Sequence, residues 1–101
     1  MAKFSLKLTK RYLHDLKLAR KRGMDESLLN DIIGKLLEDV PLPEKNRDHQ
    51  LHGDYEGYHE CHITPNWLLI YVKDTDINII SLSRTGIHSD LFDKKNKLKA
   101  K

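Results

Sequence analysis

The stretch Trp67 to Val72 constrains the fold more than any other part of the chain, because it is apolar without interruption. A strand that buries one face alternates apolar and polar residues, whereas a continuously apolar strand is typical of a sheet that is covered on both faces. With 101 residues and 39% hydrophobic content, the chain has material for one small core. We therefore expect a single domain built around a central strand at 67–72.

The N-terminal residues predict a strand followed by a helix. Phe4, Leu6 and Leu8 alternate with polar residues, which is the period-two pattern of a strand with one buried face. Thr9 is a suitable N-cap for a helix, and Gly23 supplies its end. These features place a strand and a helix in the first quarter of the chain.

A second helix is expected between its cap at Asp25 and Pro41, because leucine and isoleucine recur there at helical spacing. Neither helix is long enough to be stable alone, so both should pack on a sheet. Strand or strand-edge pieces are expected at 48–52 and 58–63, and a further strand at 77–82. The order β-α-α-β-β-β predicts an α+β domain with its helices on one face, spanning residues 1–92. The Lys-rich residues 93–101 form a separate tail, expected to be loose.

Charge is segregated along the chain. Residues 1–22 hold eight Lys or Arg against the single acid Asp15, and the tail holds five Lys against Asp93. Residues 25–56 instead hold nine acids against three bases. A basic start and tail suit a polyanion such as nucleic acid, although a solvated helix face gives the same count.

The single cysteine excludes an internal disulfide and fits a reducing cytosol. No segment has the length or hydropathy of a signal peptide or a membrane span. We therefore expect a cytoplasmic protein that does not contact a membrane.

Side chains capable of acid-base chemistry gather between residues 49 and 92, which contain five of the six histidines. His62 is expected near the turn before the central strand, and Arg84 and His88 where the last strand ends. Histidine, arginine and aromatic residues at strand ends are what phosphodiester cleavage without a metal would use.

The sequence resembles the YafQ-type toxins of the RelE/ParE superfamily from the first helix to Phe92. The residues that carry the resemblance are Asp15 to Ala19, Arg22, Asp48-His49, Leu51, Gly53, Gly57-Tyr58, His62, Pro65 to Trp67, Leu69 to Tyr71, Arg84 to His88 and Leu91-Phe92. The resemblance implies a RelE-like fold, with a small twisted antiparallel sheet and an N-terminal helical hairpin. It also implies a type II toxin that cleaves messenger RNA, generally on the ribosome, and a cognate antitoxin partner.

The functional positions of that family carry over to His49, His62, Arg84, His88 and Phe92. One position departs from the pattern, because Asn66 stands before Trp67 where the family commonly has Asp. Asn can orient a neighbouring group but cannot accept a proton near neutral pH. Either the histidines carry all proton transfer, or this chain cleaves more slowly.

These residues divide into three tasks that RNA cleavage requires, because the 2′-hydroxyl of RNA is its own nucleophile. His88 is expected to be the general acid, with His62 or His49 as the base. Arg84 would hold the phosphate, and Phe92 would either stack on a base or pack against the tail.

Four basic residues of the first helix are expected to contact ribosomal RNA. They are Lys10, Arg11, Lys17 and Lys21.

A zinc site is considered first, and two other functions stay open. His59-Glu60-Cys61-His62 contains potential zinc ligands, but on a strand His59 and Cys61 point away from His62, so neither a metal nor another cofactor is expected. A ParE-like toxin that binds a protein such as DNA gyrase would explain the charge and the fold equally well. It would give no reason for the histidines. A catalytically degenerate toxin would explain Asn66.

Overall fold

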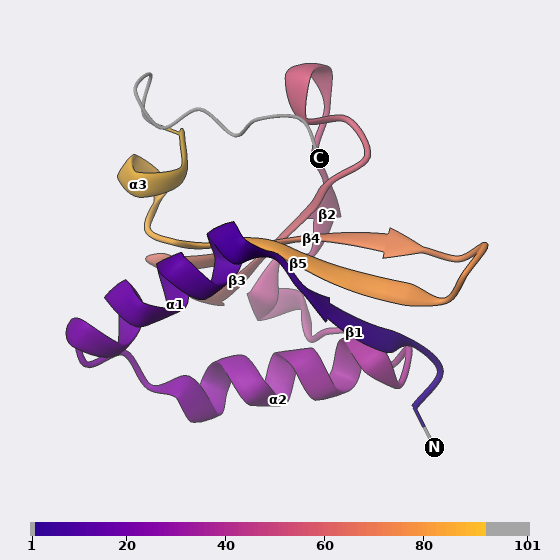
Figure 1. Ribbon diagram of the computed structural model, residues 1–101, viewed down its shortest axis with the longest axis horizontal. Coiled ribbons are helices and arrows are strands. Elements are labelled where there is room, and N and C mark those ends of the chain that lie inside the picture. Colours follow the sequence, from indigo (N-terminus) through magenta and orange to yellow (C-terminus); the bar gives the residue numbers. More distant parts are fainter. Residues whose placement is uncertain (1, 93–101) are drawn as a thin grey trace.

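The protein was analysed as a computed structural model that describes residues 2–92. The chain runs through a strand, two helices, four further strands and a final short helix (Figure 1). The elements are β1 (Ser5–Leu8), α1 (Lys10–Lys21), α2 (Glu26–Leu37), β2 (His49–Gln50), β3 (His59–Thr64), β4 (Trp67–Asp74), β5 (Ile79–Gly86) and α3 (His88–Phe92), with short 3-10 turns η1 (Glu44–Asn46) and η2 (Gly53–Tyr55). The expected tail at 93–101 lies outside the described residues.

The strands form one sheet in the order β1-β5-β4-β3-β2. The pairs β2–β3, β3–β4 and β4–β5 are antiparallel, as expected. The pair β1–β5 is instead parallel, because the chain leaves β1 through the helices and returns beside it only in β5. The predicted α+β class with an N-terminal helical hairpin is confirmed. Two details are corrected: β1 pairs in parallel, and the two-residue β2 adds a fifth strand to the four of the predicted order.

Both long helices begin at the predicted caps. The side chain of Thr9 accepts a hydrogen bond from the backbone N–H of Tyr12 at 3.1 Å, and that of Asp25 accepts one from Ser27 at 3.0 Å. Gly23 separates the helices with a φ of +73°, in the left-handed region that favours glycine. The sequence therefore sets the position of the hairpin.

Apolar side chains cover both faces of β4, as its uninterrupted apolar sequence predicted. Trp67, Leu69 and Tyr71 belong to the cluster on which α1 and α2 pack. Leu68 and Ile70 belong to a second, smaller cluster on the opposite face. That second cluster also contains Tyr58 and Leu91, with Leu51, Tyr55, Val72 and Phe92 packed against it.

Strand β5 is longer than the predicted 77–82 segment and ends at Gly86. The apolar pattern stops at Leu82 because the next residues are polar, so it underestimates the length of the strand. The backbone of residues 83–85 nevertheless continues the pairing with β4. Arg84 consequently lies within a strand and is 5% exposed, where the sequence predicted a residue leaving the strand end. Among residues 2–92, no helix has the length and hydropathy to span a bilayer.

Candidate active site

A row of four residues crosses the sheet on the face opposite α1 and α2. His49 of β2 pairs with Glu60 of β3, Glu60 pairs with Ile70 of β4, and Ile70 pairs with Arg84 of β5. Directly paired residues in a sheet point to the same face. The strand register therefore brings His49 and Arg84, which are 35 positions apart in sequence, onto one surface with Glu60.

Glu60 lies between two of the predicted site histidines. Its carboxylate Oε1 is 3.4 Å from Nε2 of His49 and 3.7 Å from Nε2 of His62. The Glu60 side chain is only 6% exposed, whereas those of His62 and His49 are 14% and 48% exposed. A buried carboxylate this close to two imidazoles can accept a charge-assisted hydrogen bond from either ring.

The hydrogen bonds of His49 identify which of its nitrogens is free. Its Nδ1 donates to the carbonyl oxygen of Arg47 at 2.6 Å, since a carbonyl can only accept. In the neutral ring Nε2 then carries a lone pair, and this lone pair faces the Glu60 carboxylate. A ring nitrogen with a lone pair can accept a proton from a substrate hydroxyl, which makes His49 a candidate base.

The short helix α3 brings two more predicted residues to this surface. The ring centroids of His88 and His62 are 6.2 Å apart, and those of His88 and Phe92 are 5.5 Å apart. Phe92 also makes an edge-on contact with Tyr55, at 5.4 Å between centroids. The Phe92 ring is half-buried by these contacts, so it packs on the site and still keeps part of its surface exposed.

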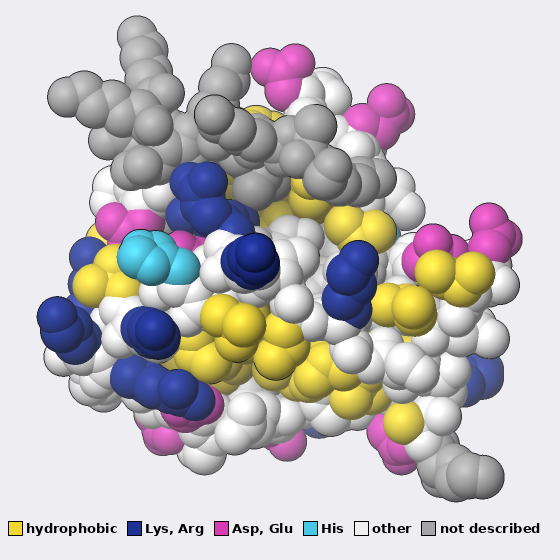
Figure 2. Space-filling model, viewed as in Figure 1, with side chains coloured by type: hydrophobic (Ala, Val, Ile, Leu, Met, Phe, Trp, Pro, Cys, Tyr) yellow, Lys and Arg dark blue, Asp and Glu magenta, His cyan; other side chains and the backbone are white. Residues whose placement is uncertain are grey.

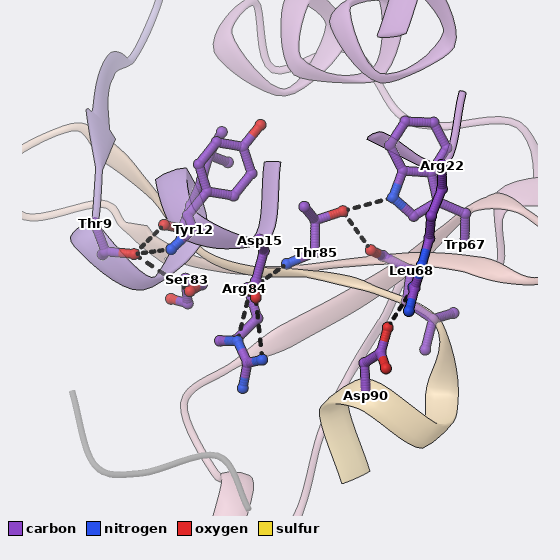
Figure 3. Close-up of polar contacts among 11 residues, drawn as sticks. Thr9, Tyr12, Asp15, Arg22, Trp67, Leu68, Ser83, Arg84, Thr85 and Asp90 are labelled. Atoms are coloured by element: carbon purple, nitrogen blue, oxygen red, sulfur yellow. Dashed lines mark hydrogen bonds and ion pairs between the residues drawn. The ribbon is translucent and has the colours of Figure 1, made fainter. Parts of the chain in front are cut away.

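Arg84 is held by a buried carboxylate from α1 (Figure 3). Its Nε and Nη2 donate to Asp15 at 2.6 and 3.2 Å, and the backbone N–H of Thr85 donates to the same carboxylate at 3.2 Å. Its remaining nitrogen, Nη1, is buried and has no hydrogen-bond partner among the described residues. An unpaired buried donor costs a fold about 1–3 kcal/mol unless water, an ion or a ligand satisfies it.

The other predicted RNA-contact residues are on the surface. Asn66 is exposed in the turn between β3 and β4. The basic side chains of α1 also face solvent, and Figure 2 shows Lys and Arg side chains over this helix. The exposed α1 residues are Lys10, Arg11, Lys17 and Lys21.

The segment 59–62 divides between the two faces of the sheet. His59 stacks on Tyr71 at 5.1 Å and Cys61 belongs to the cluster under the helices, whereas His62 lies on the opposite face. Burial raises the pKa of the Cys61 thiol well above its usual range, which disfavours the thiolate that a metal would need. Within residues 2–92, no three His, Cys, Asp or Glu side chains are arranged to hold a metal ion.

Three site residues were not predicted from the sequence. Glu60 was considered only as a zinc ligand, although its spacing of two from His62 places both on one face of a strand. Asp15 gave no signal of its own, because a polar residue on a helix is usually solvated. Tyr55 lies in a glycine-flanked turn with no periodicity to indicate its contact with Phe92.

Comparison with known proteins finds relatives that are similar in sequence and in fold. The mRNA interferase toxin YafQ of Escherichia coli K12 is 42% identical over 82 residues, covering 80% of this chain and 87% of that protein. The crystal structure of the E. coli DinJ-YafQ toxin-antitoxin complex superimposes with a TM-score of 0.81 at 34% identity, covering 89% of this chain and 98% of that one. A metal-bound toxin from Helicobacter pylori gives a TM-score of 0.83 at 37% identity, covering 88% and 99%.

The model of the family described as bacterial toxin of type II toxin-antitoxin system, YafQ, matches residues 4–93. That range contains the two long helices, the whole sheet and the candidate site residues His49, His62 and His88. The resemblance seen in the sequence and the expectation of an mRNA-cleaving type of toxin are thus confirmed at the level of the family. The chain belongs to the YafQ family of bacterial toxins from type II toxin-antitoxin systems.

Proposed function

We propose that this chain is an endoribonuclease that cleaves messenger RNA on the ribosome, without a metal ion, by general acid-base catalysis. The observation that carries the proposal is the pair of imidazoles, His49 and His62, that face the buried Glu60 carboxylate, with His88 beside His62. RNA cleavage needs only a base, an acid and positive charge at the phosphate. The site offers a candidate for each.

His49 is the base in this proposal. Its Nε2 takes the proton from the 2′-hydroxyl, and the resulting imidazolium is attracted to Glu60. The 2′-oxygen forms a bond to phosphorus as the bond from phosphorus to the 5′-oxygen breaks. This leaves a 2′,3′-cyclic phosphate on one fragment.

His88 is the acid, which gives its proton to the departing 5′-oxygen. It is exposed on the first turn of α3, so it can reach a bound strand. His62 lies between Glu60 and His88, where it orients both ends of the site. Such proton transfers typically contribute about 10²–10⁴ in rate.

Arg84 supplies positive charge to the phosphate through Nη1, the nitrogen that lacks a partner. Asp15 fixes the guanidinium plane, since it accepts from the other two nitrogens. Because Arg84 is buried, this step requires the phosphate to enter deeply, or the segment around α3 to move. Phe92 completes the surface as a platform on which a splayed base stacks.

The partners in this proposal are mRNA on the ribosome, ribosomal RNA and a cognate antitoxin. The exposed basic residues of α1 suit the phosphate backbone of ribosomal RNA. An antitoxin follows from the harm that a free ribonuclease would do, and the E. coli relative has been solved with the antitoxin DinJ. An antitoxin segment rich in acidic residues would match the basic first 22 residues.

The proposal is tested with purified protein and translating ribosomes, with mapping of the mRNA 5′ ends. We expect cleavage of ribosome-bound mRNA, intact free mRNA, and the same rate after the toxin has been treated with EDTA and desalted. His14→Ala is a matched control, because His14 is an exposed histidine of α1 outside the site. Absence of cleavage together with inhibition of DNA gyrase would instead support a ParE-like toxin.

A further inference from the structure

A second charged contact ties α1 to the site, and it involves Arg22 and Asp90. Arg22 ends α1, and its Nη1 lies 2.6 Å from Oδ2 of Asp90 in α3 (Figure 3). The two residues are 68 positions apart, and their side chains are 38% and 30% exposed. A pair this open is generally a weak contributor to global stability. Its effect must therefore be sought in the local geometry of α3.

Helix α3 is too short to hold its own orientation. It has five residues, and isolated helices of this length do not persist in water. Leu91 anchors it, with a fully buried side chain in the cluster that also contains Leu68 and Ile70. Leu91 and the half-buried Phe92 pack on this cluster from one side of α3, so they fix the depth of the helix but do not by themselves set its tilt.

The Arg22–Asp90 contact supplies a second fixed point on α3. His88, Leu91 and Phe92 are spaced by three and four residues, so they share one face of the helix, and Asp90 projects from another. Holding Asp90 against α1 while Leu91 is buried sets the angle at which His88 and Phe92 meet the site. The backbone N–H groups of Asp90 and Leu91 both donate to the carbonyl of Ile87. A shift of Asp90 would therefore move the whole turn.

We propose that Arg22 is a positioning residue for the cleavage reaction, because its ion pair with Asp90 fixes the orientation of α3 and thereby of His88 and Phe92. The inference rests on the proposed function for the role of His88. It adds that α1 is part of the catalytic architecture, since α1 holds β5 through Asp15 and α3 through Arg22.

The test measures single-turnover cleavage on ribosomes for Arg22→Gln and Asp90→Asn. Because misplacement of a catalytic group by about 1 Å can cost about 10²-fold, we expect each variant to be slower by about tenfold or more at saturating substrate. The concentration for half-maximal rate should change little. The control is Arg20→Gln, which removes the same charge and a similar exposed ion pair, with Glu26 of α2, without touching α3.

Swapping the charges of Arg22 and Asp90 distinguishes a positioning role of Arg22 from a direct contact with RNA. If the pair acts by holding α3, Arg22→Asp combined with Asp90→Arg should be faster than either single reversal. A slow Arg22→Gln with a normal Asp90→Asn would instead make Arg22 an RNA contact and overturn the proposal.

Hydrogen exchange tests the position of α3 independently of cleavage activity. Amide hydrogen exchange at Leu91 should accelerate in Arg22→Gln and remain unchanged in Arg20→Gln. Unchanged exchange at Leu91 overturns the positioning role even where cleavage is slow. If exchange at Leu91 accelerates in Arg22→Gln but the wild-type protein cleaves no mRNA, the ion pair does hold α3 and the proposed function is wrong.

Discussion

Arg84 and Asp15 form a buried ion pair that joins the last strand to the first helix, with 2.6 Å between Nε and Oδ2. The side chains are 6% and 9% exposed, so neither charge is compensated by bulk water. One nitrogen of the same guanidinium has no partner within residues 2–92, and in our proposal it binds the phosphate. A single contact thus links the stability of the domain to its chemistry.

The first prediction concerns stability. Asp15→Ala leaves the Arg84 charge buried without a partner, and we expect the free energy of unfolding to fall by about 3–5 kcal/mol. Urea unfolding followed by circular dichroism measures the change. Glu26→Gln breaks an exposed pair with Arg20 and should have a much smaller effect. Equal losses in the two variants would mean that the Asp15–Arg84 pair is no more important than a surface contact.

A second prediction concerns Asn66, where the family commonly has Asp. Asn66→Asp places a carboxylate in the exposed turn before Trp67, where it can take up a proton or hold a histidine in its protonated form. We expect cleavage on ribosomes to be retained or to become faster. A rate reduced tenfold or more would show that this chain has adapted to the amide.

The basic face of α1 gives a prediction about salt. Replacing Lys10, Arg11, Lys17 and Lys21 by Gln removes four exposed charges, so ribosome binding should weaken and its dependence on salt concentration should flatten. Equilibrium binding at several KCl concentrations measures the slope, and circular dichroism checks the fold. An unchanged slope would leave this surface merely solvated.

His59 gives a prediction about pH. Burial lowers its pKa and is the largest effect; nearby Asp48 opposes it, while Lys73 and His49 lower the pKa further. Below about pH 6.5, the usual pKa of histidine, the unfolded chain therefore binds more protons at this position than the folded one, and stability falls as the pH decreases. In His59→Phe, which keeps a ring against Tyr71, the loss of stability between pH 7.5 and 5.5 should be smaller. Identical losses would contradict this account.

Much of the fold could be predicted because its signals are local. The caps at Thr9 and Asp25, the break at Gly23 and the apolar run at 67–72 each act within a few residues, and all are confirmed. The parallel pairing of β1 with β5 depends on residues more than 70 positions apart, for which a pattern in either strand gives no signal.

The structure brings together several residues that the sequence singled out, but their surroundings could not be predicted. His49 and His62 both face Glu60, and His88 lies beside His62 and Phe92, so these four candidate residues are neighbours in the structure. The burial of Arg84 could not be predicted, because it follows from Asp15 on another element. The strand register that sets Glu60 between two histidines is likewise a property of the whole sheet.

The central claim is that His88 and Arg84 act on the phosphate, and single-turnover cleavage of mRNA on ribosomes tests it most directly. We expect His88→Ala to be slower than the wild type by about 10²–10⁴-fold while antitoxin binding remains, since the lost group is a proton donor that the fold does not need. Arg84→Ala should be comparably slow through lost charge at the phosphate. Cleavage by His88→Ala at the wild-type rate would contradict the acid assignment, and an equally unaffected Arg84→Ala would place the active site elsewhere.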